Sequence, residues 1–162
     1  MTTIDALIER KQPFAVYRIP GEKIPCLVTQ EEGAVRLIYD LQELNGQRGF
    51  VIAPFRPNET CPILLIQSNG PGQPLLLADD ADAVPRDIPS TDYPSCSEEY
   101  AECFRTFISA LRDKTFEKLV LSRKLTIGKP SAFSPSLAFR AACQRYIHSY
   151  IYLCYTPQTG IW

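Results

Sequence analysis

One lysine lies in a run of residues whose types and order suit acid–base chemistry. The stretch TFEKLVLSRKLTIG, residues 115–128, alternates between two kinds of side chain, which predicts a β-strand. Strand geometry places Lys118, Val120, Ser122, Lys124 and Thr126 on one face, and Leu119, Leu121, Arg123, Leu125 and Ile127 on the other. The leucine-rich face is expected to pack in the core. Lys118, on the other face, is therefore expected to face either solvent or a cleft.

These two positions of the Lys118 amine differ chemically. In solvent the side chain is an ordinary cation, as is common for lysines that flank strands. In a cleft, removal from water disfavours the ammonium form, and the neutral amine takes a proton from water. The second position makes Lys118 a general base. The spacing of the residues alone leaves both readings open.

The elements before this stretch are predicted to be mainly strands. Residues 4–10 place apolar side chains at helical spacing and predict one short helix. Five short apolar or alternating runs follow, separated by Gly, Pro, Asn and Asp, as in strands joined by turns. These runs are FAVYRIP, PCLVTQ, AVRLIYDL, GFVIAPF and PILLIQ. Five prolines between residues 70 and 94 then predict a surface connector. Residues 1–94 are therefore expected to form a mainly β region that ends in a Pro-rich connector.

Helical patterns return after the connector. An apolar stripe over residues 97–112, behind the candidate caps Ser95 and Ser97, predicts a helix that covers a sheet face. A second helix is predicted over 135–150, with Ser134 as its cap and Pro135 in its first turn. YIYLCY and TGIW predict a closing hairpin. The fold class expected is α+β, with a largely antiparallel sheet and packed helices, and residues 95–162 begin a second region.

Composition excludes several functions. Seventeen basic and eighteen acidic residues leave a net charge of −1 over 162 residues, and no basic run suits nucleic acid or an anionic membrane surface. The N-terminus has no apolar run of signal-peptide length, so we expect a soluble cytoplasmic protein. The six cysteines, none in a C-x-x-C pair, are expected to be reduced and mostly buried.

The remaining candidate residues have ordinary explanations. His148 is the only histidine, and we expect it on the flank of the 135–150 helix. Ser122 lacks a G-x-S-x-G turn. Arg56 can be read as an anion site, but a turn between two strands explains it as well. We expect Arg123 to pair with a carboxylate or a helix end, the glycine-bearing residues 68–74 to be a loop, and Cys103 and Cys143 to lie on the apolar stripes of their helices.

The runs KLVLSRKLTI and YIYLCYTPQTGIW, separated by a helix, resemble the chorismate-utilising enzymes and most closely the isochorismate synthases. That family has a strand of the form K-[VL]-V-L-[SA]-R and a later hairpin ending in G-x-W-L-G-A-T-P-E. Lys118, Val120, Leu121, Ser122 and Arg123 match the first motif, and Gly160 and Trp162 begin the second. The resemblance covers residues 97–162 and implies part of a chorismate-binding fold like that of anthranilate synthase component I.

The resemblance also implies a reaction. Isochorismate synthase replaces the C4 hydroxyl of chorismate by a hydroxyl at C2: a base activates water, an acid protonates the leaving hydroxyl, and Mg²⁺ holds the carboxylate. By match, Lys118 is the base, because relatives that add ammonia typically have glutamine there. Isochorismate of this origin leads to menaquinone or to catecholate siderophores. Salicylate synthase and other chorismate-utilising enzymes remain alternatives.

The sequence departs from the family after Trp162. The glutamate that closes G-A-T-P-E, which is the family's acid, and the family's metal-binding glutamates have no counterpart in this chain. We therefore expect a fragment that is inactive alone and that self-associates through exposed sheet edges. An alternative from another class is a non-catalytic α+β binding or structural module.

Overall fold

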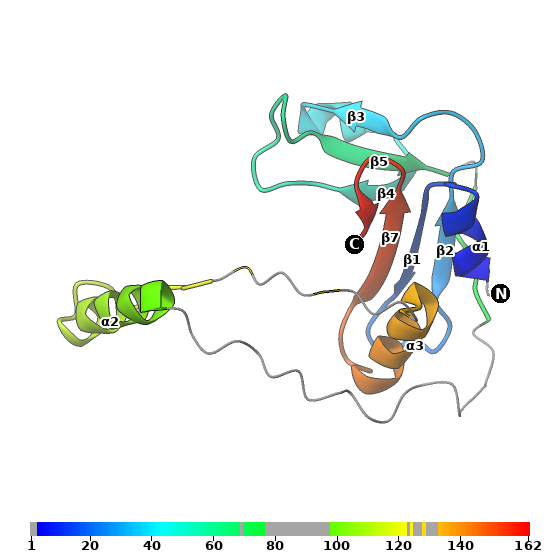
Figure 1. Cartoon of the computed structure of the whole chain (residues 1–162). Coiled ribbons are helices and arrows are strands. Elements are labelled where there is room, and N and C mark those ends of the chain that lie inside the picture. Colours follow the sequence, from blue (N-terminus) through cyan, green and yellow to red (C-terminus); the bar gives the residue numbers. More distant parts are fainter. Residues whose placement is uncertain (1–2, 69, 77–97, 123, 125–127, 129–132) are drawn as a thin grey trace. The chain divides into compact units, whose positions relative to one another are not determined.

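The computed structural model describes residues 3–68, 70–76, 98–122, 124, 128 and 133–162. Contacts divide the chain into two units, the first made of residues 1–84 and 134–162 and the second of residues 85–133. The described elements comprise three α-helices, one short 3₁₀ helix and strands whose pairings are all antiparallel (Figure 1). The described part of the chain therefore has the expected α+β class.

A five-stranded sheet forms the centre of the first unit. Its strand order is β6-β2-β1-β7-β8. The strands are β1 (Phe14–Arg18), β2 (Cys26–Thr29), β6 (Gln73–Pro74), β7 (Ile151–Thr156) and β8 (Gly160–Ile161). The predicted closing hairpin is confirmed, and β7 pairs with β1, far away in the sequence. The sheet therefore joins both ends of the chain, across the boundary expected at residue 94.

The smaller sheet has three strands in the order β3-β5-β4. Its strands are β3 (Arg36–Ile38), β4 (Gly49–Ile52) and β5 (Ile63–Gln67), and the 3₁₀ helix η1 (Leu41–Leu44) follows β3 behind the capping residue Asp40. Gly49 has a φ of +148°, and a Cβ there would overlap the Ile66 carbonyl oxygen of the paired strand. Only glycine fits this position without a shift of the backbone.

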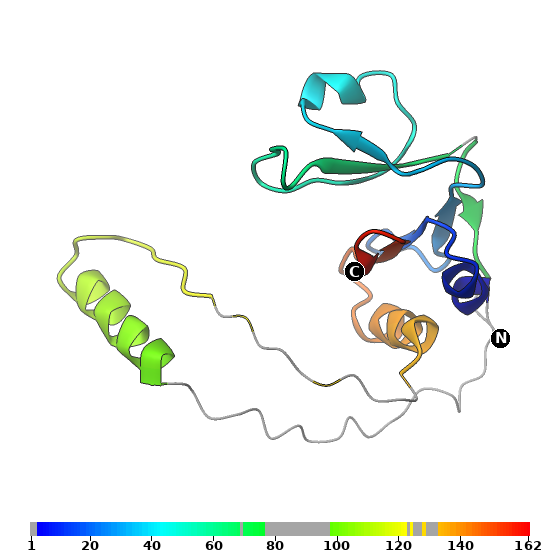
Figure 2. The ribbon, with the colours of Figure 1, turned by 45° about the horizontal axis from the view of Figure 1, so that its top comes forward.

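Two helices pack on one face of the larger sheet. They are α1 (Thr3–Glu9) and α3 (Pro135–Arg145), which lie side by side in Figures 1 and 2. The cluster that joins them to the sheet contains Ile4, Leu7, Phe14, Val16, Leu27, Phe139, Cys143 and Leu153. The alternation along β1 explains this arrangement, because Phe14 and Val16 point to the helices and Ala15 points to the other face.

The opposite face of the larger sheet packs on the smaller sheet. The shared cluster consists of Ala15, Val28, Val35, Leu64, Ile66 and Cys154. Gln30, which is 5% exposed, connects the sheets: its Oε1 accepts a hydrogen bond from the Gln67 N–H at 3.0 Å. Because β1 is buried on both faces, its sequence is almost continuously apolar. The first unit is thus layered as helices, five-stranded sheet and three-stranded sheet.

Two elements of the first unit, and two cysteines, differ from the expectations. The region expected to be a connector begins with β6, a strand of two residues that pairs with β2. β6 lies at the edge of the sheet, where proline is tolerated because it has no backbone N–H to donate. The helix predicted over 135–150 begins as expected, with Ser134 as its cap, but ends at Arg145. Cys61 in the first unit and Cys103 in the second unit are exposed rather than buried.

The second unit differs more from the expectations. Helix α2 (Glu98–Arg112) confirms the predicted helix, but no residue on it is buried, whereas its apolar stripe was expected to cover a sheet. The strand predicted over 115–128 is wrong for residues 115–122, 124 and 128, which are not in a strand. A strand needs a neighbour for its backbone N–H and C=O groups, and no described segment pairs with this one. The caps Ser95 and Ser97 lie outside the described residues.

No helix in the described ranges has the length and apolar character needed to cross a bilayer. The largest helix, α2, has 15 residues and includes charged side chains on its exposed surface. A membrane-spanning helix needs about 20 mainly apolar residues.

Candidate functional site

Lys118 lies in an irregular segment after α2 and is exposed. Its neighbours Glu117 and Ser122 are also exposed, and Val120 is 76% exposed. The described part of the second unit therefore forms no sheltered pocket around the amine. The role of Lys118 as a base stays a prediction from the motif.

The second matched motif lies in the first unit, on β8. Gly160 has a φ of +73°, which the turn before β8 requires, and it pairs with Thr156. Trp162 exchanges two backbone hydrogen bonds with Cys154, both at 2.9 Å, and its side chain is 62% exposed. β8 is therefore an edge strand of the sheet, opposite to β6, and runs antiparallel to β7.

The other candidate residues take different positions. His148 lies in the loop after α3 rather than on the helix, and it is exposed. Arg56 lies in a turn as expected and is exposed, and residues 70–72 form part of a loop. Arg123 lies outside the described residues. Lys118 and the β8 residues belong to different units of the chain.

Arg18 is the notable residue that the sequence reasoning missed. It is 3% exposed at the end of β1, and it donates hydrogen bonds to four backbone carbonyls. Its Nη1 donates to Glu22 O (3.2 Å) and Ile147 O (3.0 Å), and its Nη2 donates to Tyr146 O (2.6 Å) and Ser149 O (3.2 Å). Arg18 therefore occupies backbone carbonyls just after α3 that a longer helix would need for its own hydrogen bonds. This explains why the helix ends at Arg145.

The signal for Arg18 was present in the sequence. In the alternating run FAVYR, Arg18 falls on the same face as Phe14 and Val16, which point into the core. An arginine at a core position must find several acceptors, because burying a cation without partners is costly. The sequence does not show where those acceptors lie, since three of them are about 130 residues away, at 146, 147 and 149.

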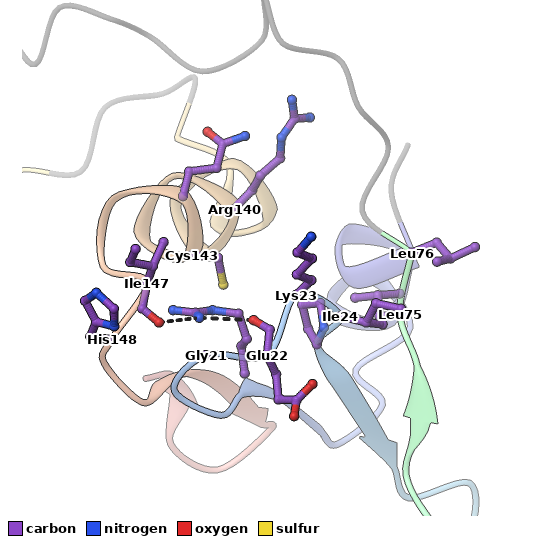
Figure 3. Close-up of a pocket in the computed structure, with 13 residues that line it drawn as sticks. Gly21, Glu22, Lys23, Ile24, Leu75, Leu76, Arg140, Cys143, Ile147 and His148 are labelled. Carbon is purple, nitrogen blue, oxygen red and sulfur yellow. Dashed lines mark hydrogen bonds between the residues drawn. The ribbon is translucent and has the colours of Figure 1, made fainter.

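A cavity of about 540 Å³ opens beside Arg18, between α3 and the loop that connects β1 and β2 (Figure 3). Ligand pockets commonly have volumes of roughly 300–1,000 Å³. The charged and polar residues that line the cavity come from three segments of the first unit. These residues are Arg18, Glu22, Lys23, Arg140, Gln144 and His148. Its apolar lining includes Ile24, Leu75, Leu76 and Ile147.

Two buried thiols lie in the first unit. Burial raises the pKa of Cys143, which lines the cavity, while the neighbouring Arg18 acts in the opposite direction. Burial alone raises the pKa of Cys154 from 9.0 to about 11. Because the folded protein holds this proton more tightly than the unfolded chain does, Cys154 contributes a loss of stability as the pH rises from about 9 to about 11.

Alkylation tests this description of the cysteines. We expect iodoacetamide at pH 8 to modify the exposed Cys61 at least about tenfold faster than Cys154, because the buried thiol is shielded and roughly one in a thousand is ionised. Peptide mass spectrometry measures both rates, and in denaturant the two should become similar. Equal rates in the native protein would contradict the burial of Cys154.

The described residues provide no magnesium site. No group of three or more His, Cys, Asp or Glu side chains converges within the described ranges. Mg²⁺ binds through carboxylate oxygens held in near-octahedral geometry. Mg²⁺ as a cofactor therefore stays a prediction from the resemblance, which places its ligands outside this chain.

Comparison of the chain with protein family models, with curated proteins and with solved structures gave no match. The structure by itself defines an α+β protein with two antiparallel sheets and helices on one face of the larger sheet. Two features of the described residues bear on function: the exposed Lys118 and the cavity beside the buried Arg18.

Proposed function

We propose that this chain supplies the base-bearing part of an isochorismate synthase, with Lys118 as the base that activates water. The observation that carries the proposal is the run from Lys118 to Arg123, in which the lysine required for water addition stands at the motif position. Gly160 and Trp162 support it, because they stand in order at the start of the second motif and on a closing hairpin.

The proposed reaction moves a hydroxyl group around the chorismate ring. Lys118 takes a proton from water, and the water oxygen forms a bond to C2 as the ring double bonds shift. The C4–O bond breaks, and the C4 hydroxyl leaves as water once an acid has protonated it. In this scheme chorismate is the substrate and Mg²⁺ is the cofactor, whose ligands the resemblance places outside this chain.

The exposure of Lys118 limits what these 162 residues do alone. A general base works on a substrate held within hydrogen-bond reach in a site that excludes bulk water. The described residues form no such shelter around Lys118, so we expect the isolated 162-residue chain to leave chorismate unchanged. The same exposure favours the second candidate function, a non-catalytic α+β module whose lysine is an ordinary surface cation.

An assay with chorismate and Mg²⁺ tests the proposal. The natural protein that contains this sequence is incubated with both, and the products are separated by chromatography. We expect isochorismate, while salicylate would identify the related salicylate synthase instead. Unchanged chorismate would overturn the proposal and favour the module. The isolated chain, assayed in parallel, provides the background.

A further inference from the structure

We propose that the cavity beside Arg18 binds a small organic carboxylate with an apolar body. The proposal does not depend on the function of Lys118, which belongs to the other unit of the chain. It rests on three features of the cavity: a buried cation with no counter-ion among the described residues, an exposed lysine directed into the cavity, and an apolar wall.

The buried cation is the Arg18 guanidinium. All four of its hydrogen bonds go to neutral backbone carbonyls, and its Nε has no partner among the described residues. A buried charge that has hydrogen bonds but no counter-ion leaves a positive potential around it. An anion in the adjoining cavity lowers the energy of this arrangement.

An exposed lysine adds to the positive charge of Arg18. Lys23 contributes one positive charge to the lining and Glu22 one negative charge, and the two side chains point in different directions. Figure 3 shows the Lys23 amine directed into the space between α3 and the segment that carries Leu75 and Leu76, while the Glu22 carboxylate points away from α3. Lys23 is exposed, so it can contact a ligand that enters from solvent. We therefore place the anionic group of the ligand at the Lys23 amine.

The apolar wall determines the chemical character of the rest of the ligand. Ile24, Leu75, Leu76 and Ile147 line the cavity, and Ile24 and Leu76 are 53% and 82% exposed. Covering exposed apolar surface is favourable by about 25 cal/mol per Å². A ligand with a flat apolar body covers these side chains, whereas acetate or inorganic phosphate does not. A volume of about 540 Å³ leaves room for such a body.

Titration with simple probes tests the site. The ¹H–¹⁵N spectrum of the 162-residue chain is followed as cinnamate, its neutral amide, benzoate or acetate is added. We expect saturable shifts for cinnamate at residues 18–25, 75–76 and 140–148, with a dissociation constant of about 1–5 mM. The affinity should fall from cinnamate to benzoate to acetate, and cinnamamide should bind at least about fivefold more weakly.

Two variants separate the charge from the apolar wall. Lys23→Gln should weaken cinnamate binding about fivefold. Lys124→Gln is the control, because it removes the same charge from an exposed lysine of the other unit. Ile24→Ser should reduce the preference for cinnamate over acetate. Both side chains are exposed, so both variants should fold. Raising the ionic strength should also weaken binding, because salt screens an exposed cation.

The proposal fails on any of three results. One is equal binding of cinnamate and cinnamamide, which would mean that the carboxylate is not recognised. Another is unchanged affinity in Lys23→Gln. The third is an absence of saturable shifts at the cavity residues for all of the probes.

Discussion

In the natural protein that contains this sequence, Lys118→Ala should lower the rate of isochorismate formation by about two to four orders of magnitude, the usual contribution of a general base. The physical reason is that alanine has no group that accepts a proton from water. Because Lys118 is exposed in the described part of the chain, removing its side chain leaves no cavity and should not change folding. Chromatographic measurement of the product gives the rate, and circular dichroism checks the fold.

Two further variants make this test specific. Lys118→Arg keeps the positive charge, but guanidinium stays protonated and does not act as a base, so we expect the same loss of rate. Lys124→Ala removes a neighbouring exposed lysine and should leave the rate within about twofold of the wild-type value. Wild-type turnover in Lys118→Ala would show that Lys118 is not the base. Activity retained in Lys118→Arg would assign the residue a charge role instead.

The second large effect concerns the core of the first unit. Phe14→Ala should lower the free energy of unfolding by about 3–5 kcal/mol, as for other buried phenylalanines replaced by alanine. Phe14 is 0% exposed on β1, packs in the cluster beneath α1 and α3, and its ring stacks 6.1 Å from that of Tyr155 on the neighbouring β7. The truncation removes contacts to both helices and to the neighbouring strand, and it leaves a cavity between them.

Urea unfolding measures this loss. A change in the midpoint at constant slope reports stability itself, rather than a change in the surface exposed on unfolding. Phe55→Ala is the matched control, because Phe55 is fully exposed and its truncation should alter stability by no more than about 0.5 kcal/mol. Equal effects of the two substitutions would contradict the placement of Phe14 at the centre of the core.

Much of the first unit could be predicted from local pattern. Five predicted strands and the closing hairpin appear close to their expected bounds, because alternating or continuous apolar runs bounded by Gly and Pro have few other ways to bury their side chains. The start of α3 was predicted as well, since Ser134 caps the helix and Pro135 fits its first turn. These features depend on residues close together in sequence.

The candidate sites show the limit of that reasoning. The motif around Lys118 identified a residue that suits base chemistry, but the strand that was to hold it is absent among the described residues of 115–128. The alternation of apolar and polar residues shows which face of a strand would be buried. It does not show whether a neighbouring strand is present to complete the backbone hydrogen bonds. The sequence therefore suggested the chemistry of Lys118 and not its environment.

By itself, the sequence determined the α+β class, most strand positions and the lysine motif, because these follow from the periodicity and identity of neighbouring residues. Only the tertiary structure decided that β7 pairs with β1, that α3 ends at Arg145, and that a cavity opens beside Arg18. Those features depend on contacts such as the Arg18 hydrogen bonds to carbonyls about 130 residues away. No local pattern specifies such a contact, because the partner is a backbone group that every residue carries.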